Sequence, residues 1–137
     1  MQTTHPPIHD ADALPWVPLA PGFSFKLLRA PSDDDTWVEM LRLDPGTVIP
    51  RHRHTGEVHA YQLAGQRELI DDGTVVGPGS YVFEPAGNVD SWRAVGDVPL
   101  IIFVTVRGAI EYLDDHDTVL RRSTALSASE HYRKGCS

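Results

Sequence analysis

The sequence predicts an all-β fold of one domain, and three observations support that fold class. Glycine and proline, 11 of each in 137 residues, interrupt the chain so often that long helices are excluded almost everywhere. The segments between them are short and rich in β-branched and aromatic side chains. A hydrophobic content of 41% with 23% charged residues fits one soluble globular domain. Short strands separated by regular turn signals are typical of a β-sandwich or β-barrel.

The expected strands follow one another along most of the chain. They cover residues 23–29, 36–43, 57–63, 67–70, 74–76, 81–84, 91–95, 100–106 and 109–113. Between them, Asp72-Gly73 suits a hairpin turn with positive φ, and Pro78-Gly79 suits a tight reversal. Residues 127–134 are expected to form one or two helical turns.

Alternation along two of these strands predicts where the core lies. In the strand 36–43, Trp37, Glu39 and Leu41 share one face because successive side chains of a strand point to opposite sides. The strand 100–106 is apolar on both faces except for Thr105, which is typical of the middle of a sandwich or barrel. Most aromatic and branched residues are therefore expected in the core.

The expected domain runs from 14 to 122, after a proline-rich lead-in at 1–13 and before a tail at 123–137. The single cysteine, Cys136, allows no intramolecular disulfide, and residues 1–10 do not resemble a secretory signal. No apolar run approaches the ~20 residues that a membrane helix requires. We therefore expect a cytoplasmic protein without membrane partners.

The charge balance argues against nucleic acid as a partner. The chain has 12 Lys and Arg against 19 Asp and Glu, a net charge of −7, and no basic cluster offsets it. Neutralisation of phosphates supplies most of the affinity of nucleic-acid binding, so that class of function is not expected. The acidic runs at 33–35 and 114–117 lack the spacing of a calcium loop and are expected to be solvated turns.

The segment from Pro50 to His59 carries the pattern that points to chemistry. His52 and His54 lie two residues apart, so in a strand they share one face while Arg51 and Arg53 point to the other. Two imidazoles about 7 Å apart on one pleated face can both bind a single metal ion. The spacing therefore predicts a metal site in which His52 and His54 are ligands.

A third ligand is expected from the strand that follows Thr55-Gly56. His59 and Glu57 are the candidates, and the strand period allows only one of them to face inward because Val58 separates them. We favour His59 and keep Glu57 open. The competing interpretation is a pair of partly exposed histidines without an ion, which a third nearby histidine in a β context makes less favourable.

Two linked motifs resemble those of the cupin superfamily. The first is a glycine, five residues, His-x-His, an acid after a short gap and a closing glycine. It matches Gly46, His52-Arg53-His54 and Gly65, with His59 at the acid position. The second is a glycine, five residues, Pro-x-Gly, two residues and a histidine. It matches Gly79, Pro85 and Gly87, with Asp90 at the histidine position. The resemblance implies a cupin, a double-stranded β-helix or jelly-roll barrel.

Within that superfamily, residues 14–120 look like the 2,4'-dihydroxyacetophenone dioxygenase family and, more distantly, the acetylacetone-cleaving dioxygenases. The segments that carry the likeness are 16–18, 21–28, 45–47, 52–59, 78–87 and 112–115. The resemblance implies a homodimer that holds non-haem Fe(II) on histidines and uses O2 to cleave a C–C bond next to a carbonyl. A small hydroxyketone or diketone would be the substrate.

Asp90 departs from that family, whose members have a metal-binding histidine at this position. The four groups His52, His54, His59 and Asp90 still supply three imidazoles and one carboxylate, and such sets bind Fe(II). Asp90 is shorter than histidine, so three alternatives stay open: it binds the ion directly, it binds through a water, or it does not reach the ion. The same ligands accept Zn, Mn or Ni, and the resemblance favours Fe(II).

Further residues are candidates for the substrate pocket. Tyr61, Phe83 and Trp92 are expected in its wall, with Arg67 or Arg93 available for an anionic oxygen of the substrate. Of these, Tyr61, Trp92 and Arg93 are the expected catalytic residues. Glu84, directly before Pro85, is expected to support the ligands rather than to bind the ion.

Two other functions remain open besides the dioxygenase. One is a cupin isomerase, cyclase or lyase that uses a metal only as a Lewis acid, or no metal, and the missing motif histidine favours it. The other is a non-catalytic sensing module, like the cupin half of zinc-dependent anti-sigma factors. Fold analogy cannot rank the first two, because one barrel serves many chemistries.

Overall fold

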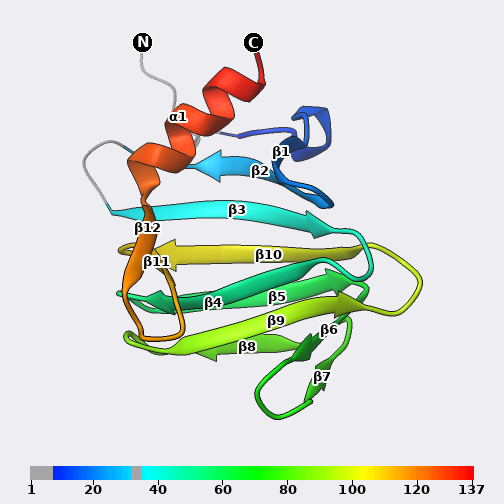
Figure 1. The fold of residues 1–137 in the computed structure, drawn as a ribbon. Helices are drawn as coiled ribbons and strands as arrows, with labels where there is room; N and C mark the ends of the chain where they lie inside the picture. The colour runs from blue at the N-terminus through cyan, green and yellow to red at the C-terminus, as the bar shows by residue number, and fades with distance from the viewer. Residues whose placement is uncertain (1–7, 32–34) are drawn as a thin grey trace, which may run out of the picture.

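Two antiparallel sheets that face each other make up the body of the molecule (Figure 1). The computed structural model describes residues 8–31 and 35–137. One sheet has the strand order β1-β2-β3-β10-β5-β8, and the other has the order β12-β11-β4-β9-β6-β7. The strands are β1 Val17–Ala20, β2 Phe23–Arg29, β3 Thr36–Leu43, β4 Val48–His54, β5 Val58–Ala64, β6 Gln66–Leu69, β7 Val75–Val76, β8 Tyr81–Glu84, β9 Val89–Val95, β10 Leu100–Arg107, β11 Ile110–Leu113 and β12 Val119–Ser123.

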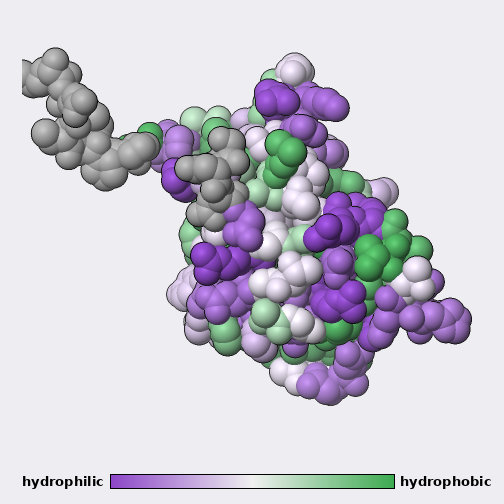
Figure 2. Space-filling model, turned by 90° about the vertical axis from the view of Figure 1, so that its left-hand side faces the viewer, coloured by the Kyte–Doolittle hydropathy of each residue, from purple (hydrophilic) through white to green (hydrophobic). Residues whose placement is uncertain are grey.

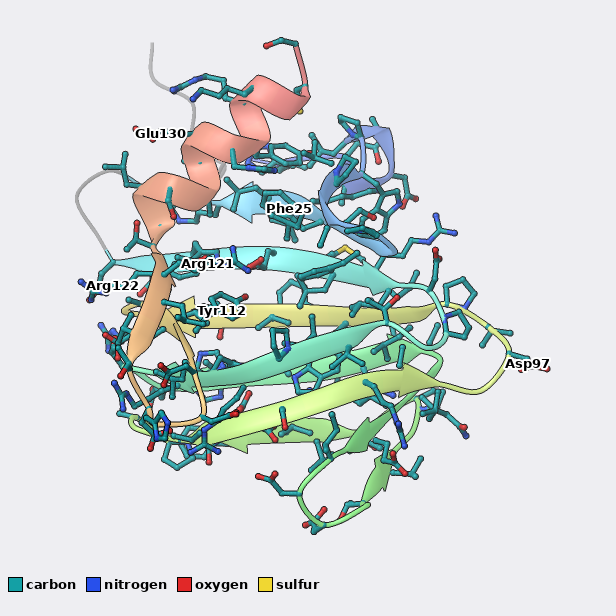
Figure 3. The ribbon with its side chains drawn as sticks, viewed as in Figure 1. Phe25, Asp97, Tyr112, Arg121, Arg122 and Glu130 are labelled. Carbon is teal, nitrogen blue, oxygen red and sulfur yellow. The ribbon has the colours of Figure 1, made fainter. Side chains whose placement is uncertain are left out.

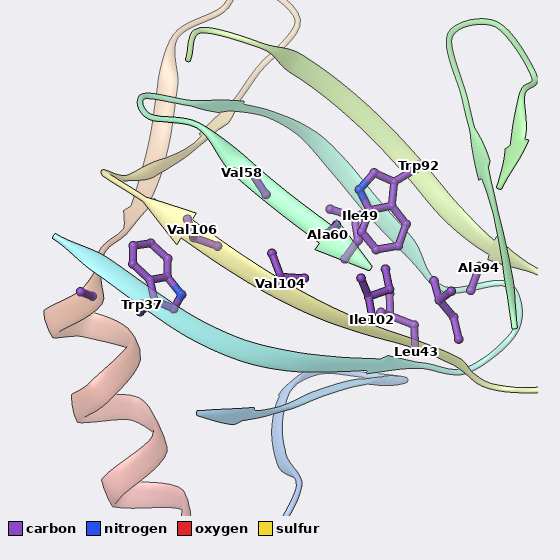
Figure 4. Close-up of a cluster of buried hydrophobic side chains, with 12 residues drawn as sticks. Trp37, Leu43, Ile49, Val58, Ala60, Trp92, Ala94, Ile102, Val104 and Val106 are labelled. Carbon is purple, nitrogen blue, oxygen red and sulfur yellow. The ribbon is translucent and has the colours of Figure 1, made fainter. Parts of the chain in front are cut away.

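The core lies between the two sheets. Trp37 of β3 and Ile102 of β10 enter it from one sheet, and Ile49 of β4 and Trp92 of β9 enter it from the other. Figure 4 shows these side chains directed into the space between the strands. Burial alternates along β10, where every second residue from Leu100 to Val106 is buried, as the pleat of a strand requires. The all-β fold predicted from the breakers and short strands is confirmed.

A short helix covers one edge of this sandwich. α1 (Ala125–Gly135) begins with a capping box in which Thr124 and Ser127 exchange hydrogen bonds. Its Tyr132 packs edge-on against Phe25 of β2, with ring centroids 5.2 Å apart, and donates a hydrogen bond of 2.7 Å to the Pro15 carbonyl. The helix is thereby held against β1 and β2, close to one end of the interior.

Several elements differ from those expected. β1 contains Pro18 and lies in the proline-rich lead-in, and η1 (Ala11–Ala13) precedes it. β12 is mostly exposed and pairs only with β11, so no apolar alternation marked it in the sequence. α1 is longer than the segment 127–134.

Some expectations lie outside the described residues. These are residues 1–7 of the lead-in and Asp33 and Asp34 of the first acidic run. Among the described helices, none is long and apolar enough to span a membrane.

Candidate metal centre

β4 directs both histidines of the His-x-His motif into the interior. His52 and His54 are 4% and 5% exposed, and their ring centroids lie 4.9 Å apart. The pairing of β4 with β9 shifts register between Ile49 and His52, so these two residues, three apart, both face inward. A bulge of this kind re-aims side chains, and here it places an apolar anchor and both imidazoles on the same face.

Glu84, the last residue of β8, completes a group of three possible ligands with His52 and His54. Their ligand atoms lie within 4.8 Å of one another, and all three residues are buried. Glu84 Oε2 is 3.8 Å from His54 Nε2. The Asn88 side-chain amide donates a hydrogen bond of 2.9 Å to Glu84 Oε1, which fixes the carboxylate. The two sheets therefore converge here, since β4 belongs to one and β8 to the other.

Each of the two imidazoles keeps a ring nitrogen that can bind a cation. His52 Nδ1 donates to the Pro50 carbonyl at 2.8 Å, which assigns the free lone pair to Nε2. Burial, with a smaller contribution from His52, lowers the pKa of His54 to about 3, so this ring is neutral. His54 Nδ1 is buried and has no hydrogen-bond partner among the described residues. Two neutral imidazoles and a carboxylate fit a divalent cation.

Asp90 lies beside this group without joining it. It is the cross-strand partner of His52 in β9, and its carboxylate accepts a hydrogen bond of 2.8 Å from the Ser91 backbone. Burial raises the pKa of Asp90, while Ser91, His52 and Arg67 oppose that rise. The carboxylate therefore lies close enough to His52 to act on the site electrostatically.

β5 and the residue before it place the expected third ligands, His59 and Glu57, away from His52 and His54. Val58 and Ala60 are the buried residues at the start of β5, so His59 between them faces outward by the strand period. His59 Nδ1 is 2.6 Å from the Tyr81 hydroxyl, and its Nε2 is 3.5 Å from Glu57 Oε1. Glu57 is exposed as well. Neither residue is brought together with His52 and His54.

The expected pocket residues divide between the two faces of the sheets. Tyr61 and Phe83 are about half exposed, because they share the outer face with His59. Arg93 is exposed and donates a hydrogen bond of 2.8 Å to Glu68 outside the barrel. These three therefore lie away from the interior.

Trp92 and Arg67 do lie inside. Both are buried, and the Arg67 guanidinium lies 4.8 Å from the centroid of the Trp92 ring. Arg67 Nε has no hydrogen-bond partner among the described residues. Burial lowers the pKa of Arg67, and Glu84 and Asp90 oppose that shift, so both carboxylates act on this cation. Arg67 thus brings a buried positive charge to the ligand group.

A cavity of about 310 Å³ connects these groups. Its polar lining comprises Glu39, His52, His54, Arg67, Glu84, Tyr112, Arg121, Arg122, Ser123, Ser127 and His131. The remainder of the wall is mainly apolar and aromatic, and includes Trp37 and Trp92. This volume suits a small organic molecule in a largely apolar site with few polar groups.

Several polar residues of this lining were not singled out as functional from the sequence, and Glu39, Tyr112 and Arg121 are among them. Glu39 is buried, and burial raises its pKa to about 7 against the hydrogen bond of 2.8 Å from Trp37 Nε1. Burial also raises the pKa of Tyr112, while Arg121 lowers it and Glu39 adds to the rise. For Glu39, the signal was a lone carboxylate on the apolar face of β3. The sequence of β12, which carries Arg121, shows no pattern that indicates a functional residue.

A comparison with known protein families identifies the family of this chain. The sequence pattern of the ChrR cupin-like domain family matches residues 5–110. The chain belongs to this family. The cupin superfamily and the barrel predicted from the two motifs are confirmed.

One relative of known function is dimethylsulfoniopropionate lyase DddQ of Ruegeria pomeroyi, which is 30% identical to this chain over 83 residues. The alignment covers 58% of this chain and 41% of the lyase, so the chain spans less than half the length of that relative.

Two solved structures show how far the cupin likeness extends. An RmlC-like cupin protein of Ralstonia eutropha is 27% identical, with a TM-score of 0.85 over 93% of this chain and 84% of its own. An acetylacetone dioxygenase of Acinetobacter johnsonii is 19% identical, with a TM-score of 0.83 over 98% of this chain and 95% of its own. At 19% identity, the likeness to the dioxygenase shows a shared fold.

Proposed function

We propose that this cupin is an Fe(II)-dependent dioxygenase that cleaves a C–C bond next to a carbonyl in a small hydroxyketone or diketone. The observation that carries the proposal is the convergence of His52, His54 and Glu84 on one point inside the cavity. Two histidines and one carboxylate leave coordination positions open, and this set is typical of non-haem Fe(II) oxygenases. The shared fold with an acetylacetone dioxygenase supports the same reaction class.

The three residues would hold the ion through His52 Nε2, one nitrogen of His54 and the carboxylate of Glu84. Bound Fe(II) supplies Lewis acidity, positions for a chelating substrate and reactivity toward O2. Zn, Mn and Ni accept the same ligands, so metal identity is part of the proposal. The hydrogen bonds of His52 to Pro50 and of Glu84 to Asn88 orient the ligands.

The other buried groups act on the substrate. Arg67 lies over the Trp92 ring, and its Nε donor has no partner among the residues that the structure describes. It is therefore placed to stabilise negative charge on an enolised carbonyl oxygen. Trp92 and the apolar wall exclude water, which strengthens that interaction. The charges of Glu84 and Asp90 offset part of the cost of burying the Arg67 guanidinium.

The test is metal content followed by O2 consumption. The protein purified without chelator is analysed by mass spectrometry for bound metals, reconstituted anaerobically with Fe(II), and mixed with hydroxyketones and β-diketones. We expect about one metal per chain and O2 uptake that equals substrate loss. Bound metal without uptake for any carbonyl compound would contradict the dioxygenase.

A lyase is the second candidate, and the 30% identity to dimethylsulfoniopropionate lyase DddQ favours it. A lyase needs no O2, so the same reconstituted protein is tested with dimethylsulfoniopropionate under anaerobic conditions. Substrate loss there, together with no O2 uptake on diketones, would replace the first proposal with the second.

The homodimer stays a prediction. Tyr61, Tyr81 and Phe83 are exposed on the outer face of β5 and β8, and β8 is an edge strand. Size-exclusion chromatography with light scattering measures the mass directly, and a species of twice 15.1 kDa is expected.

A further inference from the structure

A row of paired residues crosses the inner face of the sheet next to the candidate metal centre. Tyr112 of β11 is the cross-strand partner of His52 on one side and of Arg121 of β12 on the other. The Tyr112 and His52 ring centroids are 5.9 Å apart, and the Arg121 guanidinium lies 4.1 Å from the centroid of the Tyr112 ring. All three residues line the cavity, and Figure 3 shows Arg121 beside Tyr112. We call these residues the inner row.

The neighbouring residues form an outer row whose charges are paired. Glu111 of β11 accepts a hydrogen bond of 3.0 Å from Arg53 and lies 3.6 Å from Arg122 Nε. Arg121 forms no ion pair with any carboxylate of the described residues. Its guanidinium instead lies over the Tyr112 ring, a contact that uses the charge of the guanidinium but none of its five N–H donors.

The carboxylates around the cavity act on Arg67 and leave Arg121 as the position for an anion. Glu84 and Asp90 act on the buried Arg67, whereas no ion pair among the described residues joins Arg121 to a carboxylate. Arg121 is exposed at β12, so an entering ligand reaches it from solvent. Hydrophilic side chains dominate the face that carries β11 and β12, with smaller hydrophobic patches between them (Figure 2). In a chain of net charge −7, an arginine that lines a cavity and has no carboxylate partner within 8–31 and 35–137 is a recognition element for a negative group.

We infer that Arg121 and the hydroxyl of Tyr112 bind a carboxylate of the substrate, so that the substrate class is an oxo acid. Its carbonyl end would lie at His52, His54 and Glu84 and its carboxylate at Arg121. Two strand spacings separate Arg121 from His52, about 10 Å between their Cα atoms. An aromatic ring or a short chain between the two groups of the ligand fills that distance, against the apolar wall. The carbonyl end of this inference rests on the proposed function, whereas the anion site does not.

The anion site is tested first on metal-free protein. Benzoate and its neutral analogue benzamide are titrated by calorimetry, with quenching of tryptophan fluorescence as a second signal because Trp37 and Trp92 line the cavity. We expect benzoate to bind about 10- to 100-fold more tightly than benzamide, the size of a charge-assisted pair. Arg121→Gln should abolish this preference, and Tyr112→Phe should reduce it while keeping the ring under Arg121.

Arg122→Gln is the matched control. Arg122 is the next residue of the same strand, is also exposed and borders the cavity, but its guanidinium pairs with Glu111. It should keep the preference for benzoate. The inference is overturned if wild-type protein does not prefer benzoate, if Arg121→Gln keeps the preference, or if Arg122→Gln loses it equally. Thermal melting of each variant confirms that the fold is intact.

The substrate class is tested on the iron-loaded protein with 4-acetoacetylbenzoate and its methyl ester. Arg121→Gln should raise KM for the acid about 10-fold or more and leave KM for the ester and metal content unchanged. An equal KM change for both compounds would overturn the oxo-acid assignment. If no O2 is consumed with either compound while the benzoate preference holds, the proposed function and the oxo-acid assignment fall and the anion site stands. If O2 is consumed but Arg121→Gln changes neither measurement, the dioxygenase stands and the inference falls.

Discussion

β4 and β5 are consecutive strands that both carry histidine, yet they present it to opposite sides. β4 buries His52 and His54, while β5 exposes His59 beside Tyr81. The cause is the position of the apolar anchors: Val58 and Ala60 occupy the inward positions of β5, which leaves the outward one to His59. Gly56 between the strands packs against the Arg107 carbonyl, where a Cβ would clash. The phase of each strand, rather than the type of residue, therefore selects the candidate ligands.

The largest expected effect separates these two strands directly. His52→Ala removes one of two imidazoles from the group of three, whereas His59→Ala removes a ring on the outer face. Loss of a residue that only supports a ligand weakens metal binding about 10- to 100-fold, so loss of His52 should exceed about 100-fold. His59→Ala should leave affinity unchanged. Competition with a chelating dye measures both, and equal losses in the two variants would refute the assignment.

The carboxylates allow a similar comparison. Glu84→Gln keeps the size of the side chain and can still accept from Asn88, but it removes the negative charge. Loss of a supporting residue weakens metal binding about 10- to 100-fold, so we expect the loss of this ligand's charge to weaken it at least as much. Glu57→Gln, in which the exposed acid next to His59 is changed, is the matched control and should bind like wild type. If only Asp90→Asn weakened binding, Asp90 would be the carboxylate ligand.

Glu39 extends the comparison to pH, because it is a carboxyl on the inner face. Burial raises its pKa from 4.5 to about 7, so the folded state holds its proton where the unfolded chain has lost it. Below pH 4.5 both states are protonated. As the pH rises from 4.5 to 7, the free energy of unfolding of the wild type falls by up to about 3 kcal/mol relative to a variant with a neutral side chain of the same shape. Above pH 7 this difference is constant.

Glu39→Gln should therefore match wild type at pH 4.5 and be more stable at pH 8. Urea unfolding at both pH values measures the difference, with the exposed Glu57→Gln as control. A difference that is the same at both pH values would show that the carboxyl of Glu39 is not protonated in the fold.

The sequence was sufficient where spacing alone determines orientation. Residues two apart in a strand lie on one face, so the shared direction of His52 and His54 followed from the motif. The all-β class followed from the short strands, and the barrel from the two cupin motifs. The inward or outward direction of the β5 side chains did not follow from the motif, because it depends on which of two adjacent positions the facing sheet covers. Glu84 was expected only to support the ligands. Its position beside His52 and His54 depends on how the two sheets pack, which the spacing of residues in the sequence does not show. Arg121 was missed because β12 is an exposed edge strand with no apolar alternation.

The smallest expected effect concerns Arg93, which the sequence suggested as a catalytic residue. Its side chain is half exposed and pairs with Glu68 outside the barrel, whereas Arg67 of β6 is buried within the cavity. Exposed ion pairs contribute about 1 kcal/mol or less, so Arg93→Gln should shift urea unfolding by no more than that and leave KM for diketones unchanged. Arg67→Gln should instead raise KM or lower kcat, because it removes a buried donor beside the ligand group. A kinetic change in Arg93→Gln equal to that in Arg67→Gln would show that the face of the sheet does not decide which arginine acts on the substrate.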